Sequence, residues 1–194
     1  MFQVRAHGLG GQGVVTLVTW AAEAAYRVGK HVQAFPFFSA ERRGAPVKAY
    51  LRMDDKPISL RSQIKKPDIL LVISSSVVGL ALDEGMGENT KILINADLEL
   101  AQKLAEHLVR DVCYLDATTI ALENGLEVDG MPMVNVPLLG ALVSFAKIAP
   151  FEVVMDVLDM PARGGNYRSF KNAAKAGYFS VRCTGTEEIA VSEG

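Results

Sequence analysis

The chain has 194 residues, of which 49% are apolar and 22% are charged, so it can bury a sizeable core and wholesale disorder is excluded. The net charge of −2 and the pI of about 5.9 are not those of a basic nucleic-acid-binding module. No run of about 18 uncharged apolar residues occurs, which excludes a membrane span, and the first residues lack the apolar core of a secretion signal, so we expect a cytoplasmic protein.

The predicted elements alternate between strands and helices along the chain. This alternation predicts a single α/β domain, a Rossmann-like three-layer sandwich with a mostly parallel sheet, over residues 1–182 and a C-terminal tail over 183–194. Strands are expected at 2–7, 31–35, 47–53, 68–74, 91–95 and 112–116, and helices at 14–28, 77–82, 98–108, 118–123, 138–148, 151–158 and 170–176.

The second and third predicted strands are joined without a helix, unlike most strands in this series. Pro36 is expected to end the second strand, and no helix separates that strand from the third. A parallel neighbour needs a crossover of a dozen or more residues, so this pair is expected to be antiparallel or separated in the sheet. The apolar run at 69–73 predicts a central strand that is buried on both faces.

A glycine-rich loop between the first strand and the first helix is the strongest local motif. The spacing of Gly8, Gly10 and Gly13 matches the pattern G-x-G-x-x-G in the strand–turn–helix context that the motif requires. Glycines allow the backbone to approach a ligand closely, and the helix that follows offers free N–H groups and a positive dipole end. We expect Gly8, Gly10, Gly11, Gln12 and Gly13 to face a phosphate; a tight turn without a ligand is the alternative.

A nucleotide cofactor is only partly supported by this loop. An NAD site also needs a carboxylate at the end of the second strand, and none is present there. Arg42 and Arg43 are compatible with an NADP site, so a stand-alone NADP-dependent reductase is the alternative function. An ATPase P-loop is excluded, because no Gly-Lys-Ser or Gly-Lys-Thr follows the glycines.

The loop over residues 37–46 concentrates arginine beside glycine and aromatic residues. Residues 1–67 carry 11 basic and 4 acidic side chains, a net charge of +7, whereas the remainder carries −9. The guanidinium groups of Arg42 and Arg43 suit phosphate or carboxylate oxygens, and Phe37 and Phe38 suit an adenine or a neighbouring subunit. The alternative is a surface loop with a local salt bridge from Glu41, which contributes only about 0–1 kcal/mol.

The sequence does not offer catalytic or metal-binding machinery of its own. Cys113 and Cys183 do not lie in a metal-binding spacing, and an iron–sulfur cluster needs about four clustered ligands, so no metal is expected here. Two isolated cysteines fit a reducing, cytoplasmic location. His7, at the mouth of the glycine loop, is interpreted as a structural imidazole rather than a catalytic base, and no catalytic residue is assigned.

Several short motifs follow one another in a fixed order along the chain. They are the runs at 5–16 (Arg-x-x-Gly-x-Gly-Gly-Gln-Gly-Val-Val-Thr), 29–36 (Gly-Lys-x-Val-Gln-Ala-Phe-Pro), 41–47 (Glu-Arg-Arg-Gly-Ala-Pro-Val), 60–69 (Leu-Arg-Ser-Gln-Ile-x-x-Pro-Asp-Ile), 116–121 (Asp-Ala-Thr-x-Ile-Ala) and 135–141 (Asn-x-x-Leu-Leu-Gly-Ala). Together they resemble the gamma subunit of the 2-oxoacid:ferredoxin oxidoreductases of the pyruvate and 2-ketoisovalerate type, over about residues 3–180.

This resemblance implies a multi-subunit enzyme that converts a 2-oxoacid and CoA into acyl-CoA and CO2. It places thiamine diphosphate, Mg and [4Fe-4S] clusters on partner subunits of the alpha, beta and delta type, which pass electrons to ferredoxin or a related acceptor. The gamma chain is expected to help bind CoA and to hold the complex together without being catalytic. A purely scaffolding subunit with an empty glycine loop is the remaining alternative.

Overall fold

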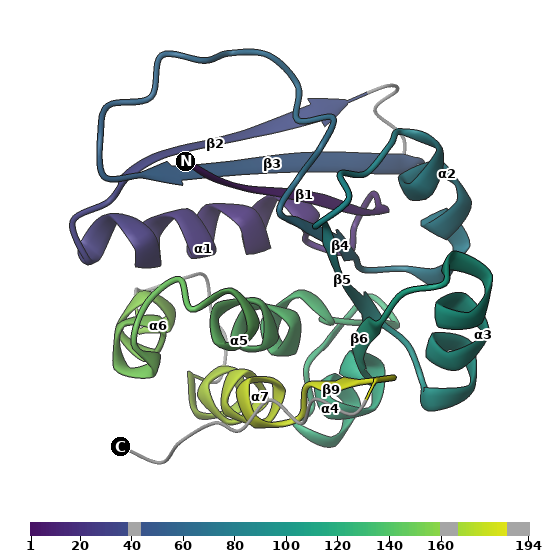
Figure 1. Ribbon diagram of the computed structural model, residues 1–194. Helices are drawn as coiled ribbons and strands as arrows, with labels where there is room; N and C mark the ends of the chain where they lie inside the picture. The colour runs from purple at the N-terminus through teal and green to yellow at the C-terminus, as the bar shows by residue number, and fades with distance from the viewer. Residues whose placement is uncertain (39–43, 160–166, 186–194) are drawn as a thin grey trace.

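A seven-stranded sheet forms the centre of the protein. The computed structural model describes residues 1–38, 44–159 and 167–185 (Figure 1). Within the described residues the strands of this sheet lie in the order β2-β3-β1-β4-β5-β6-β9. Their bounds are β1 (Phe2–Leu9), β2 (His31–Phe38), β3 (Pro46–Asp54), β4 (Ile69–Val72), β5 (Lys91–Asn95), β6 (Val112–Leu115) and β9 (Arg182–Cys183).

The strand directions confirm the expected fold class. Strands β1, β4, β5 and β6 run parallel to one another, each beside the next. β3 pairs antiparallel with both β1 and β2, as the short connection between β2 and β3 predicts, and β9 pairs antiparallel with β6. The sheet is therefore mostly parallel with antiparallel pairs at both edges, as expected of the Rossmann-like three-layer sandwich.

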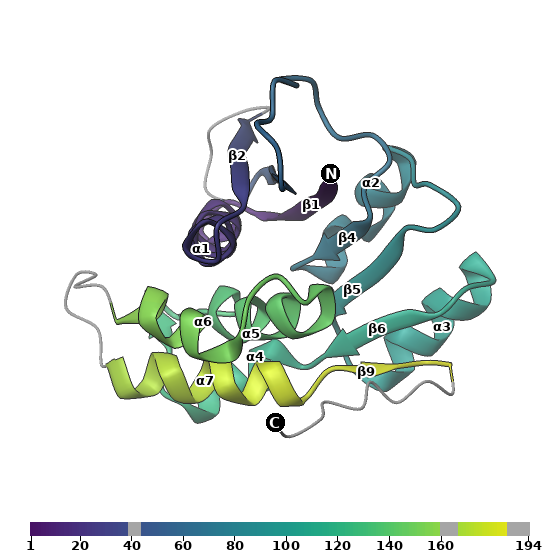
Figure 2. The ribbon, with the colours of Figure 1, turned by 60° about the vertical axis from the view of Figure 1, so that its left-hand side comes forward.

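Helices cover both faces of the sheet and make the outer layers (Figure 2). One face is covered by α1, α4, α5, α6 and α7, and the other by α2 and α3. A short 3-10 turn, η1 (Ser75–Val77), leads into α2, and the hairpin of β7 (Glu127–Val128) and β8 (Met131–Pro132) precedes α5. The helices are α1 (Val14–Arg27), α2 (Val78–Asp83), α3 (Leu98–Leu108), α4 (Ala117–Glu123), α5 (Asn135–Ala146), α6 (Phe151–Leu158) and α7 (Tyr167–Phe179).

Successive side chains of a strand point to opposite faces of the sheet, and the core is therefore divided into two apolar clusters. Ile69 and Leu71 of β4 point into the larger cluster, between the sheet and α1, α5 and α7. Leu70 and Val72 point the other way, into the cluster under α2 and α3. All four residues are buried, so β4 is the central strand that its apolar run predicts.

Several expected boundaries differ from the structure, and three of them bear on the fold. β2 continues through Pro36 to Phe38. It is an edge strand of the sheet, and an edge strand tolerates a proline, which has no backbone N–H to donate to a neighbouring strand. α5 begins three residues before the expected start and includes Pro137 in its first turn, where the backbone N–H has no intrahelical partner. Cys183, placed at the start of the expected tail, belongs to β9.

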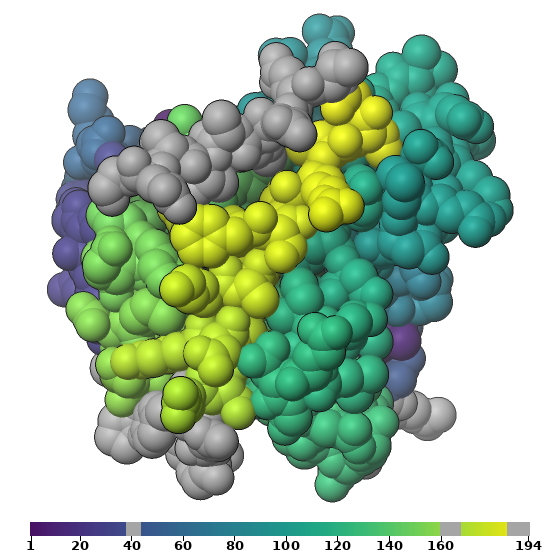
Figure 3. All heavy atoms as spheres, turned by 90° about the horizontal axis from the view of Figure 1, so that it is seen from below, coloured from purple at the N-terminus to yellow at the C-terminus, as the bar shows by residue number. Residues whose placement is uncertain are grey.

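A disulfide joins Cys113 of β6 to Cys183 of β9, which are register partners across the antiparallel pair. The two residues are 70 positions apart in sequence, so their spacing does not reveal this pairing. β9 lies beside β6 in Figure 2 and follows α7, which crosses the lower surface between α6 and α4 in Figure 3. In the part of the chain that the structure describes, no helix is long and apolar enough to cross a membrane.

Candidate functional site

The candidate site is a cleft at the carboxyl edge of the parallel strands. β1 and β4 are neighbours, but β1 leads into α1 on one face of the sheet, whereas β4 leads into η1 and α2 on the other. Ligands of open α/β sheets bind at such a switch point. The cleft has a volume of about 410 Å³ and is lined by Gln12, Ile73, Ser74, Ser75, Asn95, Ala96, Asp97, Leu100, Asp116, Thr118, Met131, Pro132 and Val134.

The glycine loop borders this cleft through Gln12. Of the five residues predicted in this loop, Gln12 is in the cleft lining. Its Oε1 accepts a hydrogen bond from the backbone N–H of Leu9 at 2.8 Å, which closes the loop on itself. Gly11 and Gly13 have φ values of +97° and +72°, which favour glycine. A Cβ on Gly13 would also lie 2.4 Å from Nδ2 of Asn135, the residue that begins α5.

The other two predicted glycines have structural roles. A Cβ on Gly8 would lie 2.7 Å from a Val14 methyl group, so Gly8 allows α1 to pack closely on β1. Gly10 donates its N–H to the carbonyl of Ala45 at 2.8 Å and accepts from the N–H of Gly44 at 3.2 Å. Backbone hydrogen bonds therefore join the glycine loop to Gly44 and Ala45, which follow the two arginines in the sequence. Arg42 and Arg43 themselves lie outside the described residues.

The first turn of α1 leaves backbone donors free at the loop. Gly13 is the N-cap residue, no side chain caps the helix, and its first turn contains no acidic residue. The N-terminal N–H groups and the positive dipole end of a 14-residue helix are therefore available to an anion.

Polar side chains at the ends of β5 and β6 form the opposite wall of the cleft. Asp97 and Asp116 cap α3 and α4, accepting from the N–H groups of Leu100 at 2.8 Å and Thr119 at 2.9 Å. Asn95 accepts from the N–H of Ala117 at 2.9 Å. The glycine and arginine motifs do not point to these residues; their signal in the sequence is a polar residue at or just after the end of each buried parallel strand. Among the described residues, the lining includes two carboxylates and no lysine or arginine, so an anion fits best at the glycine loop and hydroxyl groups fit beside the acids.

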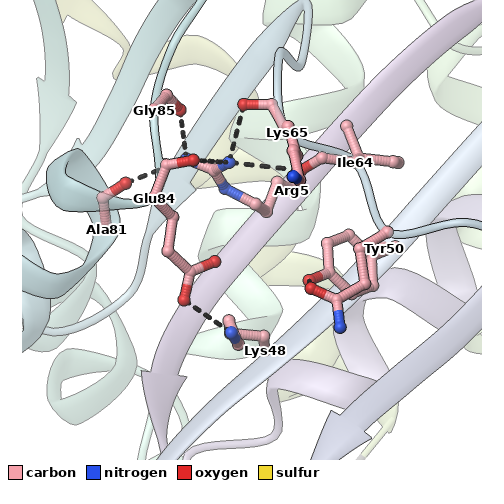
Figure 4. Close-up of polar contacts among 9 residues, drawn as sticks. Arg5, Lys48, Tyr50, Ile64, Lys65, Ala81, Glu84 and Gly85 are labelled. Atoms are coloured by element: carbon pink, nitrogen blue, oxygen red, sulfur yellow. Dashed lines mark hydrogen bonds and ion pairs between the residues drawn. The ribbon is translucent and has the colours of Figure 1, made fainter.

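A buried cluster of polar groups lies on the α2 side of β1, away from the lining of the cleft (Figure 4). The guanidinium of the fully buried Arg5 donates to backbone carbonyls, and burial lowers its pKa. Glu84 nearby forms an ion pair with Lys48 at 2.5 Å. The carbonyls that Arg5 contacts belong to Ile64, Lys65, Ala81, Glu84 and Gly85.

His7 belongs to this cluster and not to the candidate site. Its side chain is 3% exposed, and Nε2 has no hydrogen-bond partner among the described residues. Burial, together with the positive charges of Arg5 and Lys48 and against the opposing effect of Glu84, lowers the pKa of His7 to about 4. The imidazole is therefore neutral at pH 7, and the interpretation of His7 as a structural residue stays a prediction.

The aromatic residues Phe35 and Phe37 of β2 contact this chain's own strands. Phe35 packs on Tyr50 with ring centroids 4.9 Å apart, and Arg52 lies 5.5 Å from the same ring. The Lys48 ammonium lies 4.6 Å from the centroid of Phe37. Phe37 is half-buried in this way and does not line the cleft, so it does not flank a ligand there.

Comparisons with known proteins agree with this fold. A family model described as pyruvate ferredoxin/flavodoxin oxidoreductase matches residues 3–178. The common gamma subunit of the pyruvate/ketoisovalerate oxidoreductases of Thermococcus litoralis is 41% identical over 162 residues, which are 81% of this chain and 85% of the relative.

Solved structures with this fold include two related oxidoreductases. The crystal structure of a pyruvate oxidoreductase subunit from Thermotoga maritima has a TM-score of 0.80 and 32% identity, covering 95% of this chain and 98% of that one. The 2-oxoglutarate:ferredoxin oxidoreductase of Magnetococcus marinus, solved with 2-oxoglutarate, coenzyme A and succinyl-CoA bound, has a TM-score of 0.67 at 17% identity. The match covers 91% of this chain and 31% of that one, and it shows the fold alone.

The sheet order, the glycine loop and the cleft at the switch point define a Rossmann-like α/β domain. The family match and the identities above carry the assignment further: the chain belongs to the pyruvate ferredoxin/flavodoxin oxidoreductase family. Within that family it is of the gamma-subunit type.

Proposed function

We propose that this chain acts within a multi-subunit 2-oxoacid oxidoreductase, where it helps to bind coenzyme A and to hold the assembly together without being catalytic itself. The whole enzyme converts a 2-oxoacid (pyruvate, branched-chain or aromatic) and CoA into acyl-CoA and CO2. Electrons pass to ferredoxin or a related acceptor. Alpha, beta and delta-type subunits are the proposed partners.

The reactive groups are assigned to those partners. Thiamine diphosphate, Mg and [4Fe-4S] clusters are placed on them, as the resemblance to the family implies. The two cysteines of this chain support that assignment, because they are joined to each other and so are not free to ligate a cluster. The role of this chain is then to bind and orient.

The observation that carries the CoA role is the cleft at the switch point, which Gln12 of the glycine loop lines. The N–H groups at the start of α1 suit a phosphate, and Asp97 and Asp116 suit a hydroxyl group, such as the free 2′-hydroxyl of the CoA ribose. The similarly folded Magnetococcus protein, solved with CoA bound, adds support at the level of the fold.

Gln12→Glu in the assembled enzyme tests this role. The carboxylate keeps the hydrogen-bond acceptor for Leu9 but adds a negative charge to the cleft wall. We expect the KM for CoA to rise about ten-fold, the effect of roughly 1.4 kcal/mol of repulsion. Decarboxylation measured without CoA should persist, because that step takes place on partner subunits.

Gln102→Glu, at an exposed position of α3 outside the cleft lining, is the matched control and should leave the KM unchanged. An equal KM in both variants would reject the CoA role and leave a scaffolding subunit. The NADP-reductase alternative predicts that the isolated chain binds NADPH, which a fluorescence titration measures directly.

A further inference from the structure

A second cavity lies at the opposite, amino edge of the sheet. Its volume is about 690 Å³, larger than that of the cleft at the glycine loop, and none of its lining residues lines that cleft. The walls come from the segments that lead into β5 and β6 and from the end of α5. The Cys113–Cys183 disulfide forms part of the lining.

Three cations line this cavity, and none of them forms an ion pair within the described part of the chain. Lys91, Arg110 and Lys147 form no ion pair with any carboxylate among residues 1–38, 44–159 and 167–185. The Arg110 guanidinium is held by the backbone carbonyls of Thr90 at 3.1 Å and Glu88 at 3.3 Å, which orient it without cancelling its charge. The side chains of Glu88 and Asp111 also line the cavity, so three positive groups face two negative ones.

The same cavity has an apolar part. Ile92, Phe145 and Val109 are among its lining residues. The Lys91 ammonium lies 5.8 Å from the centroid of the Phe145 ring, which places a cation directly beside an aromatic surface. Charge and apolar surface therefore meet within one concave site.

Backbone strain is concentrated at the rim. Val109 and Lys147, which end α3 and α5, have φ values of +52° and +50°, and glycine is the residue that helices ordinarily use there. Of the three non-glycine residues with positive φ in the described part of the chain, two line this cavity. Val109 is also 90% exposed, so a β-branched apolar side chain is held in a costly conformation and left uncovered.

We propose that this cavity binds an organic anion that joins a carboxylate or phosphate group to an apolar body. The head group contacts Lys91, Arg110 and Lys147, and the apolar body covers Phe145 and Val109. The ligand thereby uses the unpaired cations and the exposed valine together. This site is independent of the proposed CoA role, since the two cavities lie at opposite edges of the sheet.

Amide NMR titration of the full 194-residue chain tests the proposal with hexanoate and hexyl phosphate as probes. We expect saturable shifts at residues 88–92, 109–111 and 144–147, with the tighter of the two probes identifying the preferred head group. Hexanol lacks the charge and inorganic phosphate lacks the apolar body, so each should bind at least about ten-fold more weakly than the tighter probe.

Variants make the test specific. Lys147→Gln should weaken the tighter probe by about five- to ten-fold, whereas Lys103→Gln, on α3 outside the cavity lining, should not change it. Val109→Gly should raise the melting temperature, because it relieves the strain, and should weaken binding. Shifts confined to the glycine loop, shifts that do not saturate, or equal affinities of the two lysine variants would overturn the proposal.

Discussion

Two fully buried arginines fix a long loop by its backbone. Arg5 donates to the carbonyls of Ile64 and Lys65, and Arg52 donates to that of Ser62 at 2.5 Å. A buried guanidinium is costly unless it is hydrogen-bonded, and carbonyl oxygens provide that compensation here. The 14 residues between β3 and β4 contain no helix or strand, yet these hydrogen bonds anchor them to the sheet. Replacement of either arginine by lysine would lose the forked geometry that reaches several carbonyls at once.

His7 gives the stability of the protein a defined pH dependence. Its pKa is about 4 in the folded chain and about 6.5 when unfolded, so the unfolded chain binds more protons between these values. The stabilisation is therefore complete above pH 6.5 and is lost as the pH falls towards 4, by about 3 kcal/mol in total. Chemical unfolding at pH 7.5 and 4.5 measures this loss.

His7→Gln removes the titrating group and should reduce the loss of unfolding free energy between those two pH values. His107→Gln, at an exposed position of α3, is the matched control and should behave like the parent chain. A loss of the same size in the parent and in His7→Gln would contradict the assignment of this pH dependence to His7.

At the scale of elements, α5 and α7 touch through their backbones. A Cβ on Gly140 of α5 would lie 1.9 Å from the carbonyl oxygen of Ala174, and one on Gly177 of α7 would lie 1.9 Å from that of Pro137. Each helix thus places a glycine against the backbone of the other. The residues of α5 from Asn135 to Ser144 are all buried, so this helix lacks the polar face of a surface helix.

Gly140→Ala should destabilise the chain by about 2–3 kcal/mol or more, because backbone atoms cannot move aside as a flexible side chain can. Gly79→Ala in α2 is the control: nothing lies within 4 Å of its Cβ, and alanine favours a helix over glycine by about 1 kcal/mol. Thermal or urea unfolding distinguishes the two. A Gly140→Ala variant as stable as the parent would show that the helices can separate without loss.

At the scale of the whole molecule, the disulfide attaches the end of the described chain to the sheet. It closes a loop across a separation of 70 residues, and cross-links over such distances typically contribute about 2–4 kcal/mol. The double variant Cys113→Ser/Cys183→Ser should therefore be less stable than the parent by about that amount. Urea unfolding with and without a reductant gives the comparison, since reductant should affect the parent alone. Two thiols titrating in the denatured, unreduced parent would disprove the bridge.

Local signals in the sequence predicted the fold class, the place of the glycine loop and the order of the elements apart from η1, β7, β8 and β9. Hydrophobic period and turn residues are local signals, so β5, α3 and α6 have the bounds that their sequences predict. The resemblance to the gamma subunits was carried by ordered short motifs, which are also local. The short connection between β2 and β3 predicted that they are either antiparallel or separated in the sheet, and the structure has the antiparallel pair.

Only the tertiary structure decided which distant residues share a site. It brought Asn135 against Gly13, placed Asp97 and Asp116 across the cleft from Gln12, and joined Cys113 to Cys183. It also gave Gly8 a packing role that the glycine motif alone does not distinguish from ligand binding. The physical reason is that such contacts depend on the order of strands in the sheet and the face each helix covers, and neither is encoded in the spacing of nearby residues.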